Sequence, residues 1–128
     1  ILNMTQHVAT QDQLDAGVYE PDAELKAKIV EILTFTSLPT GKDILKRANK
    51  LAMIMDFHDL DMTGDIGFMI GGAPYLMSAL APYAPIYNIF YAYSERVSEE
   101  VAQEDGSVRK VNVFKHVGFV PMTVNLAV

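Results

Sequence analysis

Two glycines, Gly71 and Gly72, follow an apolar run of strand length and precede a proline and a run of helical length. In open α/β sheets, ligands bind where the chain leaves the carboxyl end of a strand. Glycines there can adopt positive φ angles and let a ligand approach the main chain. Pro74 suits a first helical turn, whose free N–H groups attract anions. Because neither the full dinucleotide fingerprint nor a Walker Lys-Ser/Thr is present, the spacing predicts an anion-binding turn of unspecified ligand.

Polar side chains are expected at two further strand ends. Thr5, Gln6 and His7 follow the first expected strand, and Ser94 and Arg96 follow a later one. His7 could act as a general acid or base, or it could be a capping histidine or a surface histidine without a chemical role. Arg96 could clamp a phosphate with its planar fork of donors, or it could pair with neighbouring glutamates. Ser94 could bind a phosphate oxygen or cap a turn.

Three more side chains could take part in a binding or catalytic site, and each of them could instead have only a structural role. Tyr75 could stack on a base, or it could pack at the start of its helix. Lys115 and His116 offer a cation beside a titratable ring, or they protect a sheet edge from aggregation. Because neighbouring residues of a strand point to opposite faces, Lys115 and His116 cannot face the same pocket in a regular strand.

Composition narrows the class of protein. The chain has 128 residues, half of them hydrophobic, so one domain with a substantial core is expected. It contains no cysteine, which fits a cytoplasmic location and excludes thiol chemistry. The formal net charge of −6 disfavours a duplex nucleic-acid partner. No apolar run is long enough to cross a membrane, and the first residues do not resemble a signal peptide.

Neither a metal nor a cofactor is expected. Asp59 and Asp61 have the spacing of a calcium loop, but the glutamate at the twelfth position is missing. His58 is better explained by its favourable interaction with the end of a helix. The paired carboxylates Glu99-Glu100 and Glu104-Asp105 do not have the arrangement of a hydrolase pair.

Hydrophobic periodicity predicts an α/β domain over residues 1–128. A mostly parallel central sheet is flanked by helices in a core of residues 1–94, a β-hairpin covers 95–120, and 121–128 form a tail. The expected strands are 1–5, 65–70, 86–93, 97–102 and 108–120, and the expected helices are 10–16, 22–35, 42–57 and 74–80. Thr10 and Asp22 are predicted helix caps, and Gly17 a helix end.

The expected hairpin turns at Asp105-Gly106, a strong turn signal. Alternation places Val111, Val113, Val117 and Phe119 on one face, and Phe114, His116 and Val120 on the other. An open sheet with an apolar edge needs a cover, so a homodimer is expected, with the apolar tail as a further docking element.

Three segments together resemble a small family of type III CRISPR accessory proteins, which are compact Rossmann-like domains related to CARF domains. The segments are Ile1–His7 with Ala9–Gln13, the Gly71-Gly72 turn with Pro74–Met77, and Tyr91–Arg96 with Asp105–Lys110 and Val113–Val117. The match from Tyr91 to Phe119 is the most specific, whereas residues 14–62 match only in helical character. The resemblance implies a Rossmann-like (CARF-like) fold.

The resemblance also implies a function. It implies that the protein binds cyclic oligoadenylate second messengers and, as a metal-independent ring nuclease, cleaves them. His7, Arg96 and His116 would be catalytic, and the ligand would contact Thr5, Gln6, Gly71, Gly72, Tyr75, Ser94 and Lys115. A two-fold dimer would pool Arg96 and Lys115 from both subunits. The alternative is a non-enzymatic nucleotide sensor or protein-interaction module of a phage or defence locus.

Overall fold

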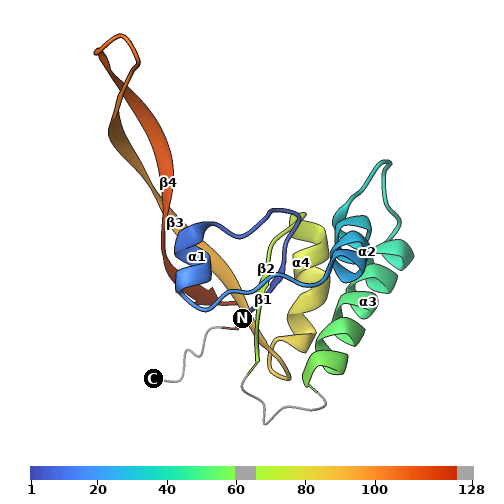
Figure 1. Ribbon diagram of the computed structural model, residues 1–128. Coiled ribbons are helices and arrows are strands. Elements are labelled where there is room, and N and C mark those ends of the chain that lie inside the picture. Colours follow the sequence, from blue (N-terminus) through green and yellow to red (C-terminus); the bar gives the residue numbers. More distant parts are fainter. Residues whose placement is uncertain (60–65, 124–128) are drawn as a thin grey trace.

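The computed structural model describes residues 1–59 and 66–123. The elements follow in the order β1 (Leu2–Met4), α1 (Gln11–Asp15), α2 (Ala23–Leu33), α3 (Gly41–Asp59), β2 (Gly67–Ile70), α4 (Pro74–Leu80), the 3₁₀ turn η1 (Ala81–Tyr83), β3 (Asn88–Ala102) and β4 (Val108–Pro121). This arrangement confirms the α/β class with flanking helices and a C-terminal hairpin (Figure 1). The expected loop at 60–64, the start of the second strand at Asp65 and the end of the tail at 124–128 lie outside the described residues.

The sheet is mixed. Its strand order is β1-β2-β3-β4, in which β1 pairs with β2 and β2 with β3 in parallel, while β3 and β4 are antiparallel. Because the parallel strands follow each other in one direction, the described sheet contains no point at which the strand order reverses. The described sheet therefore has no switch point at which a ligand would be expected, and only the carboxyl ends of the parallel strands indicate a binding position.

The two faces of the sheet have different covers. Leu2, Phe68 and Ile89 point into a core shared with α2, α3 and α4. On the opposite face Met69 packs with Ala9 and Val18, so the segment that contains α1 is the cover there. Figure 1 shows α2, α3 and α4 on one side of the sheet and α1 on the other. Short parallel strands buried in this way need no alternation of polar and apolar residues, as the sequence shows.

The expected helix signals are confirmed. Thr10 and Gln13 form a capping box at α1, and Gly17 follows that helix with a φ of 99°. Asp22 accepts the Leu25 N–H at 2.8 Å and caps α2. These caps satisfy N–H groups that a helix cannot bond internally. They fix where the chain enters α1 and α2, and so hold the loop after β1 in place.

β3 and β4 form a long two-stranded arm. The ladder with β2 ends at the Met69–Phe90 pair, whereas the ladder with β4 continues to the Ala102–Val108 pair. The arm projects away from the helices (Figure 1). The predicted break between strands 86–93 and 97–102 was wrong: β3 is continuous because β4 supplies backbone partners along its whole length. Ser94, Glu95 and Arg96 therefore lie within a strand and not at its end.

A one-residue shift interrupts the arm's ladder. Tyr93 pairs with Gly118 and Ser94 pairs with His116, so Val117 is an extra residue in β4, as in a β-bulge. The shift reverses the alternation beyond this point. Phe119 therefore lies on the face of His116, with ring centroids 4.7 Å apart. The prediction that Phe119 shares the face of Val111 and Val113 was wrong for this reason.

No helix in the described ranges 1–59 and 66–123 has the length and apolar character needed to cross a membrane.

Candidate functional site

A hollow of about 490 Å³ lies at the carboxyl ends of β1 and β2. Its lining unites two of the three segments that the sequence singled out, and β3 supplies one wall. The residues are Thr5, Gln6, His7, Val8, Thr10, Gln13, Met69, Ile70, Gly71, Gly72, Tyr91 and Ala92. Its volume lies within the usual range for small-molecule sites. Thr5–His7 and Gly71-Gly72, which the sequence placed at the ends of two separate strands, thus line the same hollow.

A buried asparagine organises the loop beside the hollow. Asn3 is fully buried, and its amide donates to the His7 carbonyl at 2.8 Å and to Glu20 Oε1 at 2.7 Å. Its Oδ1 accepts from the N–H and the hydroxyl of Thr5 at 2.9 and 2.7 Å. A buried amide with all these bonds is costly to replace, because each lost partner leaves a desolvated polar group.

Lys26 ties the same loop to α2. Its Nζ donates to the carbonyls of Thr5 and His7, both at 2.8 Å, and lies 3.5 Å from Glu20 Oε2. Glu20 also accepts the Ala9 N–H at 2.6 Å. Asn3, Glu20 and Lys26 thus fix the backbone that presents His7. Sequence analysis missed these three residues, although a lone Asn inside an apolar strand was a usable signal.

The charge of Glu20 depends on these contacts. Burial alone would raise its pKa, but the hydrogen bonds from Ala9 and Asn3 and the charge of Lys26 outweigh burial and lower the pKa below its ordinary value of 4.5. The carboxylate is therefore ionised at neutral pH, as its role in holding the loop requires.

Few side chains of the hollow are free to meet a ligand. The Gln6 amide donates to Thr34 Oγ1 at 3.0 Å, and the Thr5 hydroxyl is bound to Asn3. The exposed imidazole of His7 has no hydrogen bond or ion pair within the described residues. Burial raises the pKa of Tyr91, which keeps this phenol neutral. No lysine or arginine is among the described residues that line the hollow, so these residues form a polar pocket without a permanent cation.

The two glycines differ from their expected role. Among described residues only Gly17 and Gly106 have positive φ, so Gly71 and Gly72 do not use the positive φ angles that glycine permits. Packing is tight at Gly72, where a Cβ would lie 3.3 Å from both Leu33 Cδ2 and Met77 Cε, so these side chains would have to shift by a few tenths of an ångström. At Gly71 a Cβ would meet only Thr5 Cγ2, at 3.7 Å. The open side of Gly71 is thus the part of the turn where a ligand can reach the main chain.

The remaining candidates do not line the hollow. Tyr75 packs edge-on against Phe35, with centroids 5.0 Å apart, in agreement with the packing alternative. Lys115 forms an ion pair with Glu99 at 3.3 Å. In the arm, paired residues share a face, so Ser94 lies with His116 and Arg96 with Phe114, on the face opposite Lys115. The prediction that Lys115 and His116 face opposite ways is therefore confirmed.

His116 has an orphan nitrogen. Its Nδ1 is buried without a hydrogen-bond partner, and the ring packs on Phe119, which in turn contacts Phe90. The His116 ring therefore packs within the arm beside the ladder shift. His116 is not among the described residues that line the hollow.

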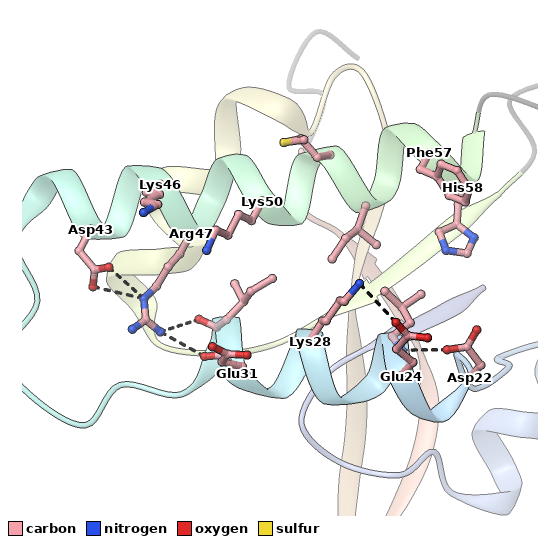
Figure 2. Close-up of a pocket in the computed structure, with 14 residues that line it drawn as sticks. Asp22, Glu24, Lys28, Glu31, Asp43, Lys46, Arg47, Lys50, Phe57 and His58 are labelled. Carbon is pink, nitrogen blue, oxygen red and sulfur yellow. Dashed lines mark hydrogen bonds and ion pairs between the residues drawn. The ribbon is translucent and has the colours of Figure 1, made fainter.

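A second hollow, of about 660 Å³, lies between α2 and α3. Figure 2 shows Lys46 and Lys50 of α3 toward the end where Asp43 and Arg47 lie, Lys28 of α2 in the middle, directed at Glu24, and Phe57 with His58 at the other end. Lys46, Lys50, Met53 and Phe57 follow one face of α3, with Met53 and Phe57 65% and 71% exposed. The sequence contains this pattern, because the four residues follow one another at intervals of three or four positions. The sequence analysis considered only the buried face of this helix and did not identify the exposed one.

Arg47 closes one end of that hollow. Its guanidinium donates to the carbonyls of Ile32 and Thr34 at 2.8 and 2.6 Å, pairs with Asp43 at 3.2 Å and stacks 4.1 Å from the Phe35 ring centre. These carbonyls belong to the end of α2, where helices lack internal donors. Arg47 is therefore a capping residue, and it is not available to a ligand.

The fold and the two hollows define an α/β protein with a mixed four-stranded sheet, a projecting β-arm and a neutral pocket at the ends of its parallel strands. Residues 1–120 match the family described as "Uncharacterized protein MJ1673 family", and the chain belongs to this family. Searches of curated proteins and of solved structures gave no match.

Proposed function

We propose that the protein binds a nucleotide ligand, of the cyclic oligoadenylate class, in the hollow at the ends of β1 and β2. The observation that carries this proposal is the meeting of Thr5–His7 with Gly71-Gly72 around one hollow of ligand size. The likeness of these same segments to CRISPR accessory proteins narrows the ligand to cyclic oligoadenylate. The position agrees with the general rule that α/β proteins bind ligands beyond the carboxyl ends of parallel strands.

The finer fold class belongs to the same proposal. Three parallel strands in the order β1-β2-β3, joined through α2, α3 and α4, have the connectivity of one βαβαβ half of a Rossmann-like fold. A CARF-like domain would place its ligand at the end of the first strand. The loop fixed by Asn3, Glu20 and Lys26 occupies this place here.

The neutral lining determines how such a ligand is held. One adenylate unit would fill the hollow, with the main chain at Gly71 and the imidazole of His7 as its polar contacts. Arg96 lies on the face of the arm that includes Ala92, about 13 Å further along the strand at the usual rise per residue. We therefore leave Arg96 out of the binding site of a single subunit.

Cleavage is a separate step of the proposal. A ribose 2′-hydroxyl would attack the adjacent phosphorus, the bond to the 5′-oxygen would break, and a 2′,3′-cyclic phosphate would form. In this proposal His7 would take the 2′-proton and return a proton to the leaving oxygen. Because the hollow offers no cation to the developing charge, binding without turnover is the second candidate function.

Calorimetry with cyclic tetra-adenylate and cyclic hexa-adenylate tests the binding step. We expect Gly71→Val to weaken binding at least tenfold, because the added methyls would enter the hollow. Gly41→Val is the matched control: a Cβ at Gly41 meets nothing within 4 Å, one at Gly71 meets only Thr5 Cγ2 at an ordinary 3.7 Å, and Gly41 lies at the start of α3, away from the hollow. A linear oligoadenylate controls for ring shape. If neither ring binds to the wild type, the proposal is overturned.

Chromatography of the rings after incubation, with and without EDTA, tests the cleavage step. A ring nuclease predicts product in both conditions, and His7→Ala should abolish product while ring binding persists. Rings that bind the wild type and remain intact would favour the non-enzymatic alternative.

A further inference from the structure

The arm exposes a long unpaired strand edge. β2 accompanies β3 only as far as Phe90, so the edge of β3 from Tyr91 to Ala102 has no strand beside it in the described structure. At about 3.3 Å per residue this edge is about 40 Å long. Free strand edges are templates for pairing with another chain, and a two-stranded ribbon is only marginally stable alone. The free edge of β3 is therefore suited to pairing with a further strand.

The hairpin end determines which backbone groups face outwards. The Gln103 N–H donates to the Ser107 carbonyl at 2.7 Å, so this pair is hydrogen-bonded within the ribbon. Hydrogen-bonded and non-bonded pairs alternate along an antiparallel ladder. Between the ladder shift and the hairpin turn, the odd-numbered residues of β3 consequently form their backbone hydrogen bonds with β4. The N–H and C=O groups of Ser94, Arg96, Ser98, Glu100 and Ala102 point away from it.

We propose that β3 pairs antiparallel with β3 of a second copy about a two-fold axis at Ser98. Ser98 then lies opposite Ser98 of the second copy, Arg96 opposite Glu100, and Ser94 opposite Ala102. Each of these pairs joins two residues whose backbone groups face outwards, as an antiparallel ladder requires. The product is a continuous four-stranded sheet with about ten new main-chain hydrogen bonds, two for each of its outward-facing pairs.

Charge selects this register and this edge. Arg96 and Glu100 have no ion pair within the described chain, and the symmetry would join them twice. Shifting the axis to Arg96 or to Glu100 would place like charges directly opposite each other. Pairing through β4 about Asn112 would place Arg109 opposite Lys115 of the second copy. Glu99 is already neutralised by Lys115 at 3.3 Å.

This pairing does not rest on the proposed ligand. It assigns Arg96 to a second copy of the chain, whereas the resemblance assigns it to a phosphate. The two roles separate experimentally, because dimerisation is measured without ligand and ring binding is measured at the hollow.

Charge reversal tests the register. Light scattering and sedimentation over a range of protein concentrations should show a dimer for the wild type. Arg96→Glu and Glu100→Arg should each raise the dissociation constant at least tenfold, and the double variant should restore dimerisation. If the single substitutions acted only by disturbing the folding of the arm, the double variant would not restore dimerisation. A wild type that stays monomeric at the highest concentrations, or single variants that dimerise as the wild type does, would overturn the proposal.

Two matched pairs of variants test the edge. Ser98→Pro removes an outward N–H of β3, and Asn112→Pro removes the corresponding N–H from the opposite edge, since Ser98 and Asn112 are direct neighbours in the ribbon. Only Ser98→Pro should dissociate the dimer. The chain has no cysteine, so Ser98→Cys should form an intermolecular disulfide on oxidation, while Asn112→Cys should not. Cross-linking through Asn112→Cys alone would place the interface on β4 and overturn the proposal.

Discussion

The side-chain amide of Asn3 donates to Glu20 Oε1 at 2.7 Å and joins the end of β1 to the segment that leads into α2. Asn3 is fully buried, and the same carboxylate also accepts the Ala9 N–H at 2.6 Å. One carboxylate thus closes the loop that covers the sheet's second face and presents His7 to the hollow.

Replacing Asn3 by leucine, which has a similar shape, should destabilise the protein by about 2 kcal/mol or more. The substitution removes the bonds of the buried amide to the His7 carbonyl, to Glu20 Oε1 and to the Thr5 N–H and hydroxyl. Lys26 and Ala9 still reach His7 and Glu20, but a polar group left unsatisfied, such as the Thr5 N–H, costs about 1–3 kcal/mol. Denaturant unfolding measures the effect. Asn49→Leu serves as the control, because Asn49 is exposed and makes only a 3.3 Å contact with Tyr83; it should stay within about 0.5 kcal/mol of the wild type.

Stability should fall in acid because of Glu20. Its folded pKa lies below the ordinary value of 4.5, so the carboxylate stabilises the folded state above that value. The contribution is lost as the pH falls through the folded pKa, because the carboxyl group must then be protonated. Unfolding free energies measured between pH 7 and strongly acidic pH should show a shallower acid loss for Glu20→Gln than for the wild type. Parallel pH profiles would contradict this prediction.

Arg47→Lys should destabilise the protein nearly as much as Arg47→Ala, by about 2 kcal/mol. The guanidinium reaches two carbonyls at the end of α2, the Asp43 carboxylate and the face of Phe35 together. An ammonium group is a single point charge and cannot reproduce this planar arrangement. Thermal unfolding of both variants measures the loss. Lys50, on the same helix, forms no ion pair within the described chain, so Lys50→Ala should have little effect.

Alanine substitutions at three glycines should differ in cost. Gly71→Ala should be nearly neutral, since its Cβ would lie 3.7 Å from Thr5 Cγ2. Gly72→Ala should cost more, because Leu33 and Met77 must move, and Gly67→Ala most, because its Cβ would lie 3.1 Å from both Ile1 and the Phe90 ring. Chemical unfolding of the three variants gives the order. A strongly destabilised Gly71→Ala protein would contradict the open space found beside that residue.

The local elements could be predicted because their signals are local. Thr10, Gly17 and Asp22 cap or end helices by bonds to residues three or four positions away. The strand from Gly67 to Ile70 and the helix from Pro74 were likewise visible in hydrophobic runs and in proline position. The meeting of Thr5–His7 with Gly71-Gly72 followed from the parallel strands, whose carboxyl ends share an edge.

The remaining features depend on partners that are distant in the sequence. The length of β3 is determined by β4, so its polar residues at Ser94–Arg96 gave a false strand end. The extra residue Val117 reverses the facing of Phe119, and only the paired strand reveals it. The roles of Asn3, Glu20 and Lys26 needed the loop's path over the sheet, because these residues are separated by up to 23 positions in the sequence.

One strand, β3, forms a wall of the hollow at Tyr91 and Ala92 and then becomes the free edge of the arm. Anything that orders the first residues of this strand also orders the template for a second copy. Occupancy of the hollow and association of the arms would then be thermodynamically linked, and the linkage would be reciprocal. Diluting the protein would weaken its apparent affinity for a ligand, and adding the ligand would shift the assembly equilibrium, although no residue needs to contact both.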